Sequence, residues 1–364
     1  MMDKLVQDSL SLLRRMVATP SLSFEEAEVC SLISATLDGW GVEHRRIGDN
    51  IVAANLSGGE GAPVLVMDAH MDTVPAAGSY TRDPFDPGTD DDVIWGLGSN
   101  DDGGSVVSMI AAYRHFLDCK APVNLILNLS CEEERSGPDG SALIFGPDGP
   151  FSKGELPTPD SVIVGEPTGM KAATSERGLL VLDGEAVGVS GHAARGEGVN
   201  ALYIALEDIK ALRDHTFVKH SPVMGDVRLT VTQINAGTAH NVVPDDCRFV
   251  VDVRPTDKYD NAELAEELQA LCKSRLTPRN LKNKSSATQD GSPLLAAVRK
   301  LGIETFSSPT TSDWIRIHHD ALKMGPGDSS RSHKADEYIL VSEIEEAVAK
   351  YIEFIETYYG NTVE

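Results

Sequence analysis

The sequence predicts an α/β protein in which a second, α+β domain interrupts a larger domain built around a sheet. Three observations support this fold class. The chain has 364 residues, more than one ordinary core of about 100 to 200 residues needs. Short apolar runs alternate with amphipathic stretches in the first half, which is typical of strands joined by helices. The pattern of apolar residues then changes near Arg177, and it changes back after about residue 278.

The first domain is predicted to combine buried strands with amphipathic helices. The predicted helices carry apolar side chains at helical spacing, and they cover residues 3–17, 24–40, 103–116, 293–301 and 342–359. The predicted strands are short apolar runs, and they cover residues 50–55, 63–68, 123–130 and 161–165. The last two helices surround a segment rich in Gly, Pro and Ser, residues 306–331, to which no helix or strand is assigned.

The second domain is predicted over residues 178–278, where a loose period-two alternation replaces the earlier pattern. Its elements follow in the order strand, helix, strand, strand and helix, at about residues 178–190, 200–213, 228–235, 246–254 and 262–274. His333 must rejoin residues 70–166 to complete the site described below, so the chain returns to the first domain. The predicted domains are therefore 1–177 with 279–364, and the inserted 178–278.

Composition and charge exclude several classes of protein. The net charge of −24 argues against a nucleic-acid-binding protein, because binding to phosphates requires an excess of Lys and Arg side chains. No apolar stretch approaches the roughly 20 residues that span a bilayer, and the first residues lack a signal-peptide core, so no membrane partner and a cytoplasmic location are expected. The acidity either aids solubility or attracts metal cations or a cationic substrate, and composition leaves both open. The five scattered cysteines are expected to be buried and reduced.

Histidine and acidic residues recur at a regular interval along the first domain. Four of them are separated by 31, 33 and 32 residues, namely His70, Asp101, Glu134 and Glu166. This interval is close to the roughly 30 residues that a strand, its crossover and the next parallel strand require. Each of the four follows a short apolar run, and ligands collect outside the carboxyl ends of such strands. We therefore expect these side chains to converge, with His333 joining them.

The chemistry of these five side chains predicts a metal site. Imidazole nitrogen combined with carboxylate oxygen suits Zn²⁺ or a related divalent ion, and it is too rich in nitrogen for a dedicated Ca²⁺ site. Because five ligands exceed the need of one tetrahedral zinc, two metals that share a bridging carboxylate fit better. Each residue alone has an ordinary alternative: a histidine after a strand can be a core or capping group, and Asp101 with Asp102 can open the following helix.

Two further acidic residues lie beside the predicted ligands. Asp72 lies two residues after His70, so on an extended segment its carboxylate could hold the second ring nitrogen of the imidazole; a surface turn before Pro75 is the alternative. Glu133 and Glu134 are neighbours that face opposite ways on an extended segment. Glu134 as a ligand and Glu133 as the general base for an attacking water is therefore the natural division, with an acidic surface loop as the alternative.

Seven motifs in a fixed order carry a resemblance to a known family. They are HMDTVP, GLGSNDDGG, EEE, VGEPT, SGHAARGEGVNA, HNVVPDD with DVRP, and GPGDSSRSH, and they extend over about residues 5 to 360. The chain resembles the di-zinc hydrolases that include aminoacylase, acetylornithine deacetylase, succinyl-diaminopimelate desuccinylase and carboxypeptidases. The resemblance implies a zinc-peptidase-like domain with a central mixed sheet flanked by helices, and a ferredoxin-like inserted domain over about residues 178 to 278 that acts as a lid and dimerises.

The resemblance also implies a role for each site residue. One zinc is held by His70 and Glu166 and the other by Glu134 and His333, with Asp101 bridging and Glu133 as the base. The remaining implied roles belong to the lid. His192 reaches into the partner's active site of a homodimer and stabilises the oxyanion, which an imidazole can do. Asn241 and Arg254 bind substrate, and a guanidinium can grip a carboxylate through two hydrogen bonds.

The predicted function is hydrolysis of the amide bond of an N-acyl amino acid by a cytoplasmic, homodimeric zinc enzyme, in which Co²⁺ can replace Zn²⁺. The motif wording is most similar to acetylornithine deacetylase-type enzymes of arginine biosynthesis, including variants that act on N-acetylcitrulline or N-succinylated substrates. A dipeptidase or tripeptidase, or a succinyl-diaminopimelate desuccinylase-like enzyme, is the alternative. A non-enzymatic metal-binding scaffold is disfavoured, because a binder has no use for the base Glu133.

Overall fold

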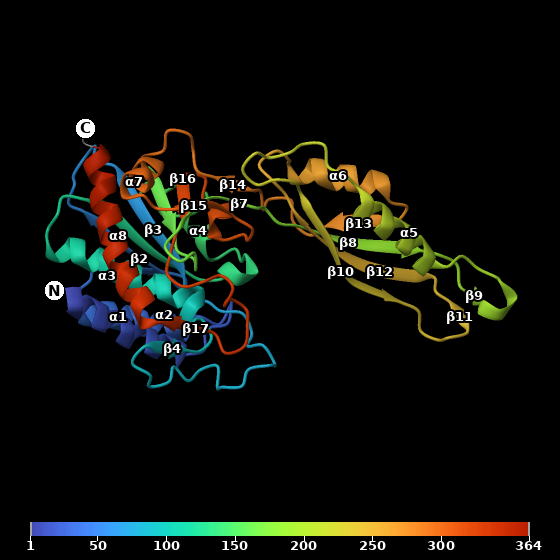
Figure 1. Ribbon diagram of the computed structural model, residues 1–364, viewed down its shortest axis with the longest axis horizontal. Coiled ribbons are helices and arrows are strands. Elements are labelled where there is room, and N and C mark those ends of the chain that lie inside the picture. Colours follow the sequence, from blue (N-terminus) through green and yellow to red (C-terminus); the bar gives the residue numbers. More distant parts are fainter. Residues whose placement is uncertain (1, 363–364) are drawn as a thin grey trace. The chain divides into compact units, whose positions relative to one another are not determined.

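The computed structural model describes residues 2–362, which form two compact units (Figure 1). Unit 1 contains the described residues up to Thr174, Thr288–Phe306, and the described residues from Ser312 onward. Unit 2 contains Ser175–Ala287 and Ser307–Thr311. Among residues 2–362, no helix is both long enough and apolar enough to cross a bilayer.

Unit 2 includes more residues than the segment 178–278 that the change in the pattern of apolar residues predicts. The strand β14 (Ser286–Ala287) pairs antiparallel with the end of β7 (Ala172–Glu176). The hydroxyl of Ser175 also donates a hydrogen bond to the hydroxyl of Ser307, at 2.8 Å. These pairings tie both ends of the insertion together beyond the region where the pattern of apolar residues changes.

Unit 1 is built on a mixed sheet, as predicted. The strand order is β1-β2-β5-β3-β6-β16-β7-β14, with β15 also paired to β7. Its centre is parallel, because β5, β3, β6 and β16 run in one direction, while β2 and β7 flank them antiparallel. The strands are β1 (Arg45–Ile47), β2 (Asn50–Leu56), β3 (Val64–His70), β5 (Asn124–Ser130), β6 (Ser161–Val164), β15 (Thr305–Ser308) and β16 (Asp320–Lys323).

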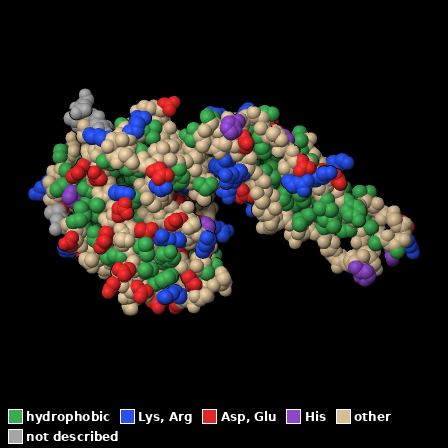
Figure 2. Space-filling model, in the orientation of Figure 1, with side chains coloured by type: hydrophobic (Ala, Val, Ile, Leu, Met, Phe, Trp, Pro, Cys, Tyr) green, Lys and Arg blue, Asp and Glu red, His purple; other side chains and the backbone are tan. Residues whose placement is uncertain are grey.

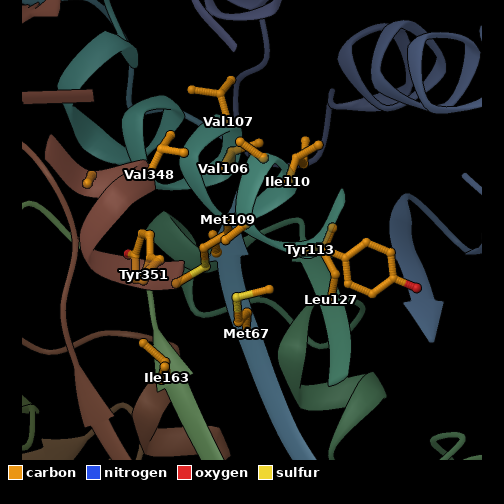
Figure 3. Packing of buried hydrophobic residues seen from close by; sticks show 14 of the residues in the cluster. Met67, Val106, Val107, Met109, Ile110, Tyr113, Leu127, Ile163, Val348 and Tyr351 are labelled. Atoms are coloured by element: carbon orange, nitrogen blue, oxygen red, sulfur yellow. The ribbon is translucent and has the colours of Figure 1, made fainter. Parts of the chain in front are cut away.

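Apolar clusters bury both faces of this sheet. Leu65 and Met67 of β3 belong to the cluster that the long helices complete, whereas Val64 and Val66 belong to the cluster on the other face. Figure 3 shows side chains of α3 and α8 packed against those of the central strands. Burial on both faces explains why these strands read as continuous apolar runs. The helices of the first cluster are α1 (Met2–Val17), α2 (Ala27–Gly39), α3 (Gly104–Asp118), α7 (Pro293–Leu301) and α8 (Val341–Thr362).

One central strand was not predicted. β16 lies inside the Gly/Pro/Ser-rich segment 306–331, yet it pairs parallel to β6 and all four of its residues are buried. Its sequence, Asp-Ala-Leu-Lys, is too short and too polar to give a strand signal. A second difference concerns β4 (Val93–Trp95), which pairs with β17 (Tyr338–Leu340) in a separate ribbon outside the main sheet.

Unit 2 has the ferredoxin-like order strand, helix, strand, strand, helix, strand. Its sheet runs β10-β12-β8-β13 and is antiparallel throughout. Leu180 and Leu182 of β8 are buried in the core that the two helices complete, while Val181 between them is only half-buried. The elements are β8 (Leu180–Val187), α5 (Ala201–Asp214), β10 (Arg228–Ala236), β12 (Asp246–Arg254), α6 (Asn261–Leu271) and β13 (Arg275–Pro278).

The cysteines follow the expectation only in part. All five are free, and Cys30, Cys131 and Cys247 are buried as expected. Cys119 is exposed and Cys272 is partly buried, so the expectation was wrong for these two. Both lie at or just after the last turn of a helix, where the pattern of apolar residues no longer marks a buried face.

The central strands give a stability prediction. Replacing Leu127, a fully buried residue of β5 (Figure 3), with alanine should lower the free energy of unfolding by about 2–5 kcal/mol, because the tightly packed core cannot refill the space. Urea denaturation measures the change. The matched control is Leu56→Ala at the exposed end of β2, where the free energy of unfolding should fall by no more than about 0.5 kcal/mol. Equal losses in the two variants would contradict the packing described here.

Candidate metal centre

His70 is the centre of the cluster of site residues in unit 1. It ends the buried strand β3 and is 2% exposed. Its Nε2 lies 3.2 Å from Oδ1 of Asp101, and its Nδ1 lies 3.0 Å from the main-chain oxygen of Asp72. The main-chain oxygen of Asp72 thus holds Nδ1, which fixes the orientation of the imidazole and leaves Nε2 facing Asp101.

Two groups of potential ligands share His70. One group is His70, Glu133 and Glu166, the other is His70, Asp101 and Glu134, and in each group the donor atoms lie within 4.8 Å of one another. His333 is adjacent to the second group, because its Nε2 lies 2.9 Å from Oε1 of Glu134 and 3.8 Å from Oδ2 of Asp101. The structure therefore brings together all five predicted ligands and the predicted base.

Strand ends deliver only part of this cluster. His70 ends β3, and Glu134 and Glu166 follow β5 and β6, as the regular interval predicts. The prediction was wrong for Asp101, because the strand before it belongs to the separate β4–β17 ribbon. Asp101 instead lies in a tight turn before α3, and the Asp101–Asp102 peptide bond is cis. His333 lies in the loop between β16 and β17.

Two acidic residues beyond His333 hold its loop in place. The Glu337 carboxylate is buried and accepts hydrogen bonds from the main-chain N–H groups of Asn100 (3.0 Å) and Asp101 (2.9 Å). The Asp336 carboxylate accepts from the main chain and hydroxyl of Thr81. The Glu337 contacts connect the loop of His333 to the turn of Asp101, and the Asp336 contacts connect it to Thr81. Sequence reasoning missed both residues, although an acidic pair so soon after a predicted ligand was a usable signal.

Asp72 makes contacts beyond the one predicted with His70. Its carboxylate is 3.4 Å from Nδ1 of His70, farther than the main-chain oxygen is. The carboxylate also accepts hydrogen bonds from the main-chain N–H groups of Glu133 (3.0 Å) and Glu134 (3.1 Å). Its main contacts therefore fix the segment that carries the predicted base.

The prediction that Glu133 and Glu134 lie on an extended segment was wrong. Glu133–Arg135 form one 3-10 turn, preceded by Glu132 in the left-handed region at φ 60°. The turn directs the two carboxylates into different ligand groups around His70. The separation expected from strand alternation is therefore produced by a turn whose N–H groups the Asp72 carboxylate holds.

Burial and charge shift the pKa values in the cluster strongly. Burial raises the pKa of Glu133 well above its usual range, and the neighbouring Glu166 and Asp313 charges add to the effect. Burial likewise raises the pKa of Glu166. The hydrogen bond with Glu134 raises the pKa of His333 to about 9. Burial alone would lower the pKa of His70, but its hydrogen bonds to Asp101 and Asp72 raise it well above the usual value.

A second pair of carboxylates lies beneath the cluster. Asp68, within β3, accepts hydrogen bonds from the side chains of Asn128 and Ser141, and Asp313 accepts one from Ser130 at 2.7 Å. Burial and the charge of Asp313 together raise the pKa of Asp68. Sequence reasoning missed both acids, because Asp68 lies within an apolar strand and Asp313 is more than 200 residues away.

The three remaining predicted residues belong to unit 2. His192 is exposed in the ribbon strand β9 (Gly191–His192), which pairs with β11 (Val242–Val243). The main-chain oxygen of Asn241 accepts a hydrogen bond from the N–H of Ala193, the residue after His192. The predicted residues His192 and Asn241 are therefore neighbours. Arg254 ends β12, and its guanidinium makes two hydrogen bonds to the Asp252 carboxylate, at 2.8 and 3.1 Å.

The donor set of unit 1 fits a pair of divalent metal ions. Three carboxylates and two imidazoles converge, and an additional half-buried carboxylate, Glu133, lies in the same cluster. Buried acids at this density are costly unless cations balance them. Nitrogen and oxygen donors in this proportion suit zinc or a neighbouring divalent metal.

Comparison with known proteins decides the family. Residues 66–357 match the profile of Peptidase family M20/M25/M40. The chain belongs to this family. Membership makes the protein a hydrolase of a metal-dependent family, consistent with the cluster around His70.

Relatives of this M20 protein span most of its length. A protein of Pyrobaculum aerophilum named as a LysW-lysine/LysW-ornithine hydrolase is 32% identical over 305 residues, which are 81% of each chain. A succinyl-diaminopimelate desuccinylase of Cereibacter sphaeroides is 28% identical over 383 residues, covering 97% of this chain and 99% of the relative.

Solved structures share the fold. An M20 family metallo-carboxypeptidase from Sulfolobus solfataricus superposes with a TM-score of 0.77 at 17% identity, covering 96% of this chain and 99% of that one. A Bacillus subtilis protein described as a dinuclear metal binding peptidase of the M20 family superposes with a TM-score of 0.71 at 17% identity, covering 99% of each chain. At these identities the likeness establishes the fold alone.

Proposed function

We propose that this M20 protein hydrolyses the amide bond of an N-acyl amino acid, with N-acetylornithine-type deacylation in arginine biosynthesis as the leading reaction. The observation that carries the proposal is the pair of ligand groups sharing His70, one of which contains the half-buried Glu133 carboxylate. A metal-binding protein without activity would need the ligands but would gain nothing from a base beside them.

Two zinc ions are the proposed cofactor, with Co²⁺ as a substitute. His70 and Glu166 would hold one ion, Glu134 and His333 the other, and Asp101 would bridge them. The Bacillus subtilis neighbour, described as binding a dinuclear metal, supports the number of ions. The bound pair supplies Lewis-acid polarisation of the substrate carbonyl and acidifies a water molecule.

Glu133 is the proposed general base and acid. Its carboxylate takes a proton from the attacking water and then delivers that proton to the leaving amine. Burial and like charges raise its pKa, which increases its affinity for the proton that it must carry between these steps. Asp72 supports this role by fixing the main-chain N–H groups of Glu133 and Glu134.

The distribution of charge supports a cationic substrate. Unit 2 holds 14 Lys/Arg and 16 Asp/Glu residues, so nearly all of the net charge of −24 lies in unit 1. Figure 2 shows acidic side chains gathered over the surface of unit 1. A negative field of this size attracts cations toward the site. An ornithine-type side chain fits that field, and the name of the Pyrobaculum aerophilum relative includes ornithine.

A panel of substrates tests the proposal. Initial rates of the zinc-loaded protein are compared on N-acetylornithine, N-acetylcitrulline, their succinyl analogues, succinyl-diaminopimelate and unmodified di- and tripeptides. The expected result is the highest kcat/KM for N-acetylornithine. A preference for succinyl-diaminopimelate would favour the second candidate, desuccinylation, which the 97% coverage by the desuccinylase relative supports. Cleavage of free peptides alone would overturn the N-acyl assignment.

Unit 2 is the proposed dimerisation unit. β10 is an edge strand of its sheet, and all of its residues are exposed or half-exposed. The adjacent helix α5 exposes Tyr203 (67%) and Leu206 (47%). An edge strand beside exposed apolar side chains is a surface that a second copy can cover by extending the sheet.

Charge on this surface should separate the subunits. The double variant Tyr203→Glu with Leu206→Glu should elute as a monomer in size-exclusion chromatography with light scattering, because two buried carboxylates would oppose association. Val218→Glu is the matched control, since Val218 is 86% exposed in a loop of the same unit. An unchanged dimer in the double variant would place the interface elsewhere.

His192 is proposed to act in the partner's active site, where it stabilises negative charge on the carbonyl oxygen. Mixed dimers test this arrangement. Inactive His192→Ala and inactive Glu133→Ala proteins are dissociated, mixed and reassociated. Activity should return, because one site of each mixed dimer then holds both intact residues. No recovery, with mixed dimers present, would mean that His192 serves its own subunit.

A further inference from the structure

The segment Ser21–Glu26, between α1 and α2, lies against the loops of the metal centre. The Ser23 hydroxyl donates a hydrogen bond to Oδ2 of Asp72, at 2.7 Å. Oε1 of Glu26 accepts the main-chain N–H of Glu132, at 2.9 Å. Glu26 is only 2% exposed, although it is an acidic residue far from the predicted ligands in sequence. We name this segment the brace.

The backbone of the brace is docked beside the chain that leaves β3. Leu22 and Thr73 form a parallel bridge. The N–H of Thr73 donates to the main-chain oxygen of Ser21 (2.8 Å), and the N–H of Ser23 donates to the main-chain oxygen of Thr73 (3.3 Å). The side chains of the brace are therefore held at a fixed position relative to Asp72.

The two brace contacts both act at the start of the turn that carries Glu133, one directly and one through Asp72. Asp72, which Ser23 contacts, accepts the N–H groups of Glu133 and Glu134. Glu132, whose N–H Glu26 accepts, adopts the left-handed conformation that begins the turn. The carboxylate of Glu132 is itself used locally, because it accepts the N–H of Asp139 at 2.9 Å.

We propose that Ser23 and Glu26 are positioning residues for the base and the adjacent ligand. Ser23 fixes the orientation of the Asp72 carboxylate, and Glu26 fixes the N–H of Glu132. Together they hold Glu133 and Glu134 at the distances that their separate roles require. The inference rests on the proposed function for its kinetic consequence, but its structural content concerns the turn alone. Loss of the Glu26 carboxylate would remove the acceptor of the Glu132 N–H, and loss of the Ser23 hydroxyl would remove one of the hydrogen bonds that orient Asp72; either change favours a rearranged turn.

Four variants test the brace. Ser23→Ala and Glu26→Ala should each lower kcat about 10- to 100-fold, the range found when residues that orient metal ligands are removed, with little change in KM. Ser23→Thr and Glu26→Gln retain the hydroxyl and the acceptor oxygen, so they should restore most of kcat. Glu25→Ala is the matched control, because Glu25 is exposed in the same segment. It should retain wild-type kcat.

Amide hydrogen exchange separates positioning from general destabilisation. In Ser23→Ala and Glu26→Ala, exchange should accelerate at Glu132–Glu134 while the amides of β3 and β5 stay protected. Wild-type kcat in both alanine variants would overturn the proposal, and so would exchange accelerated across the whole sheet with no rescue by threonine or glutamine. If the wild-type protein hydrolyses no substrate of the panel, the proposed function fails, whereas the exchange measurement still decides whether the brace holds the turn.

Discussion

Glu133→Gln should lower kcat by about 10²- to 10⁴-fold while the protein keeps its metal. Proton transfer by a positioned carboxylate contributes a factor of this size, and glutamine retains the shape of the side chain without accepting the proton. Kinetics on the best substrate of the panel, together with metal analysis of the same preparation, measures both quantities. The position of Glu133 in the ligand cluster and its elevated pKa are the structural basis of the expectation.

The metal content decides between the two neighbouring carboxylates. Glu133 forms a ligand group with His70 and Glu166, while Glu134 forms one with His70 and Asp101, so distance alone does not assign the base. The matched variant is Glu134→Gln, which should lose metal as well as activity. Loss of one metal equivalent from Glu133→Gln, with full metal content in Glu134→Gln, would exchange the two roles.

Removal of metal should abolish amide hydrolysis, and added Zn²⁺ or Co²⁺ should restore it. The expected loss is at least about 10³-fold, because polarisation of the carbonyl by the metal is worth several kcal/mol and each 1.4 kcal/mol is a factor of ten. Dialysis against a chelator, followed by titration with each ion, measures the loss and the number of ions required. Two equivalents should be needed for full activity.

A ligand variant provides the control for this titration. His333→Ala should recover less activity than the wild type at the same metal concentration, because its imidazole is the nitrogen donor closest to Glu134. His318→Ala is the comparison, since His318 is exposed and lies outside both ligand groups. Full activity in the metal-free wild-type protein would rule out a metal-dependent reaction altogether.

The sequence predicted the parts of the fold that depend on local pattern. Apolar runs located the strands before His70, Glu134 and Glu166, because burial on both faces demands continuous apolar residues there. β16 was missed because its sequence is not a continuous apolar run, although the strand is buried. Its position between β6 and β7 buries an Asp-Ala-Leu-Lys segment whose composition carries no strand signal.

The sequence also determined which chemical groups this protein can place at a site: two imidazoles, a set of carboxylates and a spare base, in an order that identified the family. Only the tertiary structure decided how they are held. Asp101 comes from a turn, and Glu337 fixes it through the backbone. The Asp72 carboxylate contacts the segment of the base as well as the imidazole, and Ser23 of the brace contacts Asp72. These contacts join segments from about 50 to more than 200 residues apart. The periodicity of apolar residues cannot predict them, because it indicates only which face of a single helix or strand is buried.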